Sequence, residues 1–102
     1  MEEPFDAATA QRHIQAILDG PGMTVFTARA KDEFLEHDMT SGDAVNVLRG
    51  GHVSTGTKTA SGFTYRAETQ RMSVEFSFRG QERESAVRPN ELVIESAWRT
   101  KR

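Results

Sequence analysis

The spacing of apolar residues changes at Gly50-Gly51, and this change constrains the fold more than any other feature of the chain. Before it, apolar residues recur every three or four positions, as on one face of an amphipathic helix. After it, apolar and polar residues alternate, as in strands that bury one face of a sheet. Helices followed by strands predict an α+β fold in which N-terminal helices pack on one face of a small antiparallel β-sheet. A chain of 102 residues forms one core, so residues 1–102 are expected to be a single domain.

Each helix predicted in the first half has a residue that can cap its N-terminus. The helices are expected over 7–18, capped by Asp6, over 28–37, capped by Thr27, and over 43–49, capped by Thr40 or Ser41. Gly20-Pro21-Gly22 ends the first helix and Gly50-Gly51 ends the third. The β-branched run at 24–27 predicts a strand between the first two helices.

The alternation after Gly51 predicts three further strands. They cover 63–68, 73–79 and 92–99, with a turn at 55–62. The side chains expected on the buried face are Phe63, Tyr65, Ala67, Val74, Phe76, Phe78, Leu92, Ile94 and Trp98. Trp98 with the basic residues after it is alternatively a stacking and phosphate-binding element for single-stranded RNA. The opposite face is expected to carry Arg66, Glu68, Gln70, Ser73, Glu75, Ser77, Arg79 and Arg99. Such a polar face is either a solvated surface or a site.

Charge is distributed unevenly along the sequence. Residues 1–50 hold four Lys and Arg against nine Asp and Glu, a formal charge of −5. Residues 51–102 hold nine Lys and Arg against six Glu, a charge of +3, which gives the whole chain −2. The basic half favours an anionic partner such as RNA.

Several classes of protein are disfavoured by the composition. The chain has no cysteine, which excludes disulfides and thiolate metal sites and is compatible with a reducing cytoplasm. The acidic start Met1-Glu2-Glu3-Pro4 is unlike a signal peptide, and no apolar run is long enough to span a membrane. The spacing of histidine and acidic residues predicts neither a metal site nor a cofactor. A cytoplasmic location is therefore expected.

Six stretches carry a resemblance to a known group of proteins. They are 25–30, 40–45, 48–53, 64–66, 72–76 and 91–98. With the order of elements, they resemble toxins of the RelE-like superfamily, and most closely the MqsR-like toxins and a related family encoded beside zinc-finger/helix-turn-helix antitoxins. The resemblance implies a single RelE/MqsR-like domain that acts as the toxin of a type II toxin–antitoxin system. The implied activity is that of an mRNA interferase, a metal-independent RNA endonuclease that inhibits translation.

The resemblance also implies partners and shows two departures. The expected partners are a cognate antitoxin protein and mRNA, either free or on the ribosome. The related family commonly has a His-Ala pair where this chain has Arg29-Ala30. It also tends to carry an arginine late in the second helix, where this chain has Glu36 and His37. If these positions support RNA binding or catalysis in the related family, this chain has altered or lost part of its RNA-cleaving site.

Metal-free RNA cleavage requires a base for the ribose 2′-OH, cations for the phosphorane and an acid for the leaving 5′-oxygen. The proton-transfer candidates are Tyr65, His52 and Glu75, and the candidates for RNA binding are Arg66, Arg79, Gln70, Arg99 and Lys101. The pair Tyr65-Arg66 matches a Tyr-Arg pair in MqsR-like toxins. In a regular strand its two side chains lie on opposite faces, and Tyr65 is as compatible with the core as with a site. The other histidines, His13 and His37, are expected at the surface.

Three functions remain open from the sequence. The first is the toxin with endonuclease activity. The second is a non-catalytic RelE-like module that binds protein or RNA, favoured by the departure at Arg29 and by the acidic helical half. The third is a toxin that cuts only on the ribosome, where the ribosome supplies part of the site.

Overall fold

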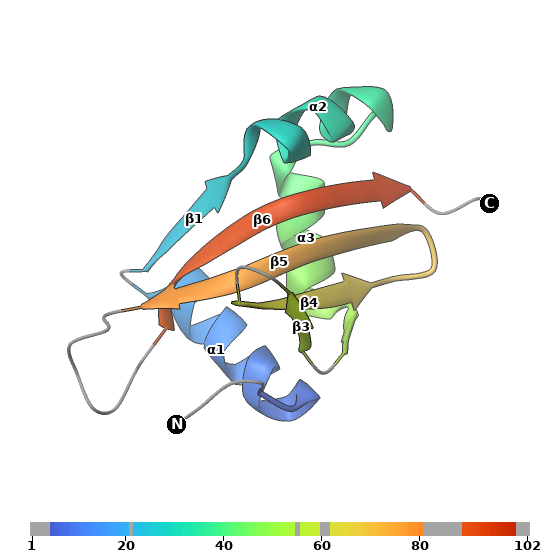
Figure 1. Cartoon of the computed structure of the whole chain (residues 1–102). Coiled ribbons are helices and arrows are strands. Elements are labelled where there is room, and N and C mark those ends of the chain that lie inside the picture. Colours follow the sequence, from blue (N-terminus) through green and yellow to red (C-terminus); the bar gives the residue numbers. More distant parts are fainter. Residues whose placement is uncertain (1–4, 21, 55, 60–61, 81–88, 100–102) are drawn as a thin grey trace.

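The computed structural model describes residues 5–20, 22–54, 56–59, 62–80 and 89–99. Its helices are α1 (Ala7–Asp19), α2 (Ala28–Glu36) and α3 (Ser41–Gly50). Its strands are β1 (Met23–Phe26), β2 (His52–Val53), β3 (Thr57–Thr59), β4 (Gly62–Glu68), β5 (Met72–Gly80) and β6 (Pro89–Arg99). The predicted α+β class is confirmed, and helices and strands follow one another as Figure 1 shows.

The helix starts depend on the predicted capping residues. The carboxylate of Asp6 accepts a hydrogen bond from the Thr9 N–H at 2.8 Å. Thr27 caps α2 by accepting from the Ala30 N–H at 3.1 Å. At α3 the N-cap is Thr40, which forms a reciprocal capping box with Asp43. Of the two caps proposed for α3, the structure therefore uses Thr40.

The sheet has the order β1-β6-β5-β4-β2, with β3 paired to β4. All pairs are antiparallel except β1 with β6, which is parallel. The prediction of an antiparallel sheet is therefore wrong for this pair. Because β1 precedes β6 by more than 60 residues, no turn joins them, and their relative direction is set by tertiary packing. The segments β2 and β3 were also not predicted, because the first has two residues and the second lies in the expected turn.

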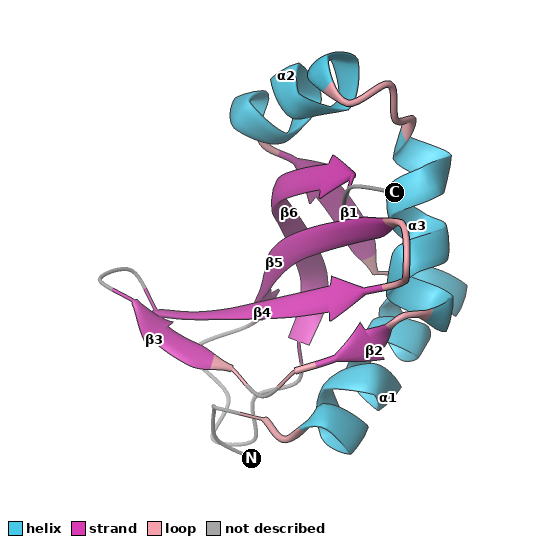
Figure 2. Ribbon diagram, turned by 90° about the vertical axis from the view of Figure 1, so that its right-hand side faces the viewer, coloured by secondary structure: helices cyan, strands magenta, loops and turns pink. Residues whose placement is uncertain are grey.

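Helices α1 and α3 lie together on one face of the sheet, while α2 lies beyond the β6 edge (Figures 1 and 2). No described helix covers the opposite face (Figure 2). The core forms between the covered face and the two helices. Its largest fully buried side chains include Tyr65, Phe76, Ile14, Leu48, Leu92, Ile94, Val47 and Val74.

A bulge in β6 decides which face each of its side chains occupies. Glu75 is paired with Ser96, but the next residue, Phe76, is paired with Ile94, so Glu95 has no partner on β5. The extra residue reverses the alternation. Ile94 and Ala97 both face the core, and Trp98 is turned to the open face. The prediction that Trp98 is a core residue alongside Leu92 and Ile94 is therefore wrong.

Helix α2 covers the edge of β6 beyond the end of β1. The Thr27 hydroxyl donates to the Glu95 carbonyl at 3.3 Å. One oxygen of Glu33 accepts from the Ala97 N–H at 2.9 Å and from the Ser96 hydroxyl at 2.7 Å. These contacts satisfy backbone groups that an uncovered edge strand would leave free to pair with another chain.

Candidate functional site: the open polar face of the sheet

The open face of the sheet collects polar side chains from four strands. One row across it runs from His52 on β2 to Glu68, Ser73 and Trp98 on the next three strands. The adjacent row is Arg66, Glu75 and Ser96. Residues directly opposite on paired strands project to the same side, so both rows belong to one surface. Of the predicted site residues, His52, Arg66 and Glu75 lie in these two rows.

Arg66 is the central cation of the open face. Its guanidinium lies 3.0 Å from a carboxylate oxygen of Glu75 and 3.9 Å from one of Glu68. It also lies over the ring of Trp98, at 5.1 Å from the ring centroid. The Arg66 side chain keeps 45% of its surface exposed. It is thus oriented by its neighbours and still reaches solvent.

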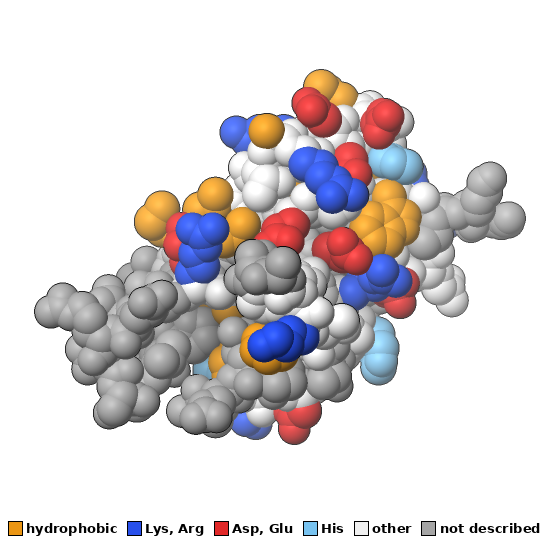
Figure 3. All heavy atoms as spheres, in the orientation of Figure 1, with side chains coloured by type: hydrophobic (Ala, Val, Ile, Leu, Met, Phe, Trp, Pro, Cys, Tyr) orange, Lys and Arg blue, Asp and Glu red, His pale blue; other side chains and the backbone are white. Residues whose placement is uncertain are grey.

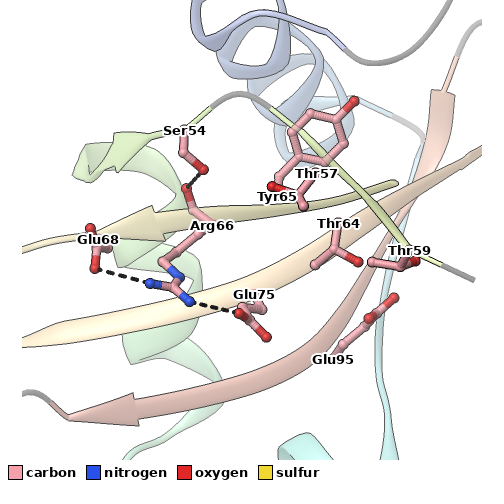
Figure 4. Close-up of a pocket in the computed structure, with 9 residues that line it drawn as sticks. All are labelled: Ser54, Thr57, Thr59, Thr64, Tyr65, Arg66, Glu68, Glu75 and Glu95. Carbon is pink, nitrogen blue, oxygen red and sulfur yellow. Dashed lines mark hydrogen bonds and ion pairs between the residues drawn. The ribbon is translucent and has the colours of Figure 1, made fainter. Parts of the chain in front are cut away.

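A pocket of about 680 Å³ opens beside Arg66 (Figure 4). Its residues are Ser54, Thr57, Thr59, Thr64, Tyr65, Arg66, Glu68, Glu75 and Glu95. The pocket thus holds three carboxylates, one guanidinium and several hydroxyl groups, and two of the carboxylates, Glu68 and Glu75, contact Arg66. The carboxylate of Glu95, the bulge residue, accepts a hydrogen bond from the Ser77 hydroxyl at 2.6 Å. The pocket is polar and carries more negative than positive charge.

Among the described residues, the basic half of the sequence forms no basic patch on this face. In the space-filling view of the open face, the basic and acidic side chains are interspersed (Figure 3). Four of the nine Lys and Arg residues of that half, including the predicted RNA-binding residue Lys101, lie outside the described residues. The charge asymmetry is therefore a weaker indication of RNA binding than the sequence suggested.

Tyr65 lies in the core, away from the open face. Its side chain is 1% exposed, and its hydroxyl accepts a hydrogen bond from the Phe5 N–H at 2.9 Å. In Figure 4 the Tyr65 ring points to the side of the sheet opposite to the Arg66 side chain. Because the strand is regular at 65 and 66, these two successive side chains project to opposite faces of the sheet. The structure does not bring Tyr65 to the other candidates for proton transfer.

Arg99 binds the end of α2. Its guanidinium donates to the carbonyl oxygens of His37 at 2.8 Å and Asp38 at 2.9 Å. Asp38 has a positive φ of 56°, typical of the residue that turns the chain at a helix end. The donors of Arg99 are thus directed at the carbonyls that end α2, away from the row of Arg66 and Glu75.

The remaining candidates lie at the margins of the face. Arg79 is exposed on β5, four residues and about 13 Å along the strand from Glu75. Gln70 lies in the turn between β4 and β5 and is exposed. His52 is exposed and stands opposite Glu68 on the neighbouring strand. Of the candidates, only Arg66 and Glu75 are in direct contact, and His52 lies in the neighbouring row, opposite Glu68.

His13 is half-buried, contrary to the prediction of a surface position. Its ring centroid lies 4.6 Å from that of Phe5 and 5.9 Å from that of Phe78. Its Nε2 atom is buried with no hydrogen-bond partner among the described residues. Burial, with a smaller effect of the Arg12 charge, lowers the pKa of His13 below its ordinary value of 6.5.

Neither metal ligation nor membrane spanning is indicated by the described part of the chain. Within it, no three His, Asp or Glu side chains are grouped as metal ligands. None of its helices has the length and apolar character needed to cross a bilayer. No protein-family model, curated protein or solved structure matches this sequence.

Proposed function

We propose that this chain is an RNA endonuclease that acts as the toxin of a type II toxin–antitoxin pair and inhibits translation by cutting mRNA in the cytoplasm. The single observation that carries the proposal is the Arg66–Glu75 pair, held at 3.0 Å on an open face that also carries His52 in the adjacent row. The RelE- and MqsR-like features of the sequence support the same class of activity, including its independence of metal ions. They also suggest a zinc-finger/helix-turn-helix antitoxin as the partner.

In this mechanism the three residues have separate roles. The Glu75 carboxylate takes the proton of a ribose 2′-OH, whose oxygen attacks the adjacent phosphorus. Arg66 binds the phosphate oxygens and stabilises the negative charge of the phosphorane. His52 protonates the leaving 5′-oxygen. The products are a 2′,3′-cyclic phosphate and a 5′-hydroxyl end.

Phosphate binding requires that Arg66 exchange one of its present contacts. The Glu68 contact at 3.9 Å joins two side chains that are each nearly half exposed, so it contributes at most about 1 kcal/mol. The shorter contact of Arg66 with Glu75 can persist while a phosphate takes the place of the Glu68 carboxylate. Glu75 then remains next to the phosphate, where the base is required.

A second candidate is a non-catalytic module that binds a protein or RNA. The observation that favours it is the charge of the pocket, where Glu68, Glu75 and Glu95 outnumber Arg66. In that case Arg66 and Glu75 neutralise each other and no proton is transferred.

Induced expression in a bacterial host distinguishes the two candidates. Wild type is compared with Arg66→Ala/Arg79→Ala and with Glu75→Gln, which keeps the shape of the side chain but removes the base. Asp32→Asn, an exposed carboxylate on α2, is the matched control. The endonuclease predicts growth arrest and new RNA 5′ ends with wild type and Asp32→Asn, and neither with the other two variants.

A cleavage assay of the purified protein adds a chemical readout. We expect 5′-hydroxyl ends that form equally in the presence of EDTA. If wild type is folded and abundant but growth is normal and RNA stays intact on and off the ribosome, the endonuclease proposal is wrong. The non-catalytic module is then the remaining candidate.

A further inference from the structure

Trp98 is the only tryptophan of the chain, and the β6 bulge places it on the polar face instead of in the core. The corresponding inward position is occupied by Ala97, which is fully buried. Trp98 itself is only partly buried. The ring therefore lies on the face that also carries Arg66 and Glu75, where it can contact a bound molecule.

Two polar residues adjoin Trp98, the fully buried Ser73 and the partly exposed Arg66. The residue opposite it on β5 is Ser73, a small side chain that is directed to Glu68 by a hydrogen bond of 3.3 Å. On the β4 side, the Arg66 guanidinium lies over the indole ring. An aromatic ring beside a guanidinium is a combination that holds an unpaired base by stacking while the cation binds the neighbouring phosphate.

We infer that Trp98 holds a nucleobase of single-stranded RNA, next to a phosphate bound by Arg66. The inference rests on the proposed function and deepens it, because it names the residue that contacts the base and restricts the substrate to unpaired RNA. In a duplex the flat faces of the bases are covered by their neighbours, and they cannot stack on a side chain.

The test uses two oligomers that the protein cannot cut. One is a 2′-O-methyl hexanucleotide of mixed sequence, in which methylation removes the nucleophile, and the other is an abasic hexamer of the same backbone. Fluorescence of wild type reports on Trp98 directly, because no other tryptophan contributes. Affinities of all variants are measured by anisotropy of labelled oligomers.

We expect the hexamer with bases to quench Trp98 and to bind wild type about tenfold more tightly than the abasic hexamer, since one stacked base contributes about 1–3 kcal/mol. Trp98→Leu loses this preference, and Trp98→Phe retains part of it. Leu35→Ala is the matched control, because Leu35 is 85% exposed on α2 and its loss removes apolar surface elsewhere.

Each contrary result has a distinct meaning. Equal affinity of wild type for the two oligomers, or a preference that survives in Trp98→Leu, overturns the inference. If RNA is nevertheless cleaved in the parallel assay, the proposed function stands without a stacking role for Trp98. If wild type neither binds the oligomers nor cleaves RNA, both proposals fall. Should Trp98→Leu not fold, wild-type quenching and Trp98→Phe decide the question.

Discussion

Glu33 on α2 accepts a hydrogen bond from the backbone N–H of Ala97 on β6 at 2.9 Å. A helix side chain thus takes the place of a neighbouring strand where β1 has ended. The same carboxylate accepts from the Ser96 hydroxyl, which is 3% exposed, and pairs with Arg29 at 3.4 Å. Burial alone would raise the pKa of Glu33, but the hydrogen bonds from Ser96, Ala97 and Arg29 outweigh it and lower the pKa.

Glu33→Ala is expected to destabilise the fold by about 1–3 kcal/mol, because it leaves a buried hydroxyl and a backbone N–H without their acceptor. The measurement is the free energy of unfolding in urea. The control is Glu36→Ala, at an exposed position three residues further along α2, which should change the free energy of unfolding little. Equal effects of the two variants would mean that the bonds to β6 contribute nothing.

Gly50 and Gly51 offer a matched pair of substitutions. A Cβ at Gly51 would lie 2.5 Å from the Val47 carbonyl oxygen and 2.8 Å from that of Glu68, whereas a Cβ at Gly50 meets nothing within 4 Å. We expect Gly51→Ala to destabilise by about 1–3 kcal/mol because backbone must shift. Gly50→Ala should be neutral or stabilising by up to about 1 kcal/mol, since Gly50 is helical. Thermal unfolding of both variants checks the order, and the reverse order contradicts the packing described.

Stability is expected to fall with acidification near pH 6 because of His13. Its pKa is lowered in the folded state, so near and below 6.5 the unfolded chain binds more protons than the folded chain. Folding free energy is therefore lost as pH decreases through that range. In His13→Phe this component should disappear, while His52→Gln, at an exposed position, should keep it. Urea unfolding at a series of pH values gives the answer, and a wild-type slope retained in His13→Phe would refute the assignment.

Arg99 is expected to matter for stability and not for RNA cleavage. Arg99→Ala removes the donors to the His37 and Asp38 carbonyls and should cost about 0.5–1.5 kcal/mol. Amide exchange at the C-terminal end of α2 should accelerate. If Arg99→Ala keeps the stability and exchange rates of wild type but loses RNA cleavage, Arg99 instead takes part in binding or cleaving RNA.

Local features of the sequence were sufficient to predict the helices, their caps and the longer strands, because these elements depend on residues close together in the chain. The interactions that place the site are not local. The bulge at Glu95 arises from pairing with β5, and no glycine or proline marks it in the sequence. Alternation alone therefore put Trp98 on the wrong face.

The candidate site was only partly predictable for the same reason. Arg66 and Glu75 were correctly placed on one face, since their strands are regular where they pair. The roles of Arg99 and Glu33 depend on where α2 lies, and neither the spacing of apolar residues nor the composition specifies that position. The environment of His13 depends on Phe5 and Phe78, which are distant in sequence from each other.

The strand order has a consequence for the synthesis of this protein. β6 is made after all the other elements that the structure describes, yet it lies between β1 and β5 in the sheet. Until residues 89–99 leave the ribosome, β1 has no partner and α2 has no edge to cover. The packing of β1 and α2 therefore depends on β6, and a nascent chain released before residue 89 would lack the strand that joins β1 to β5.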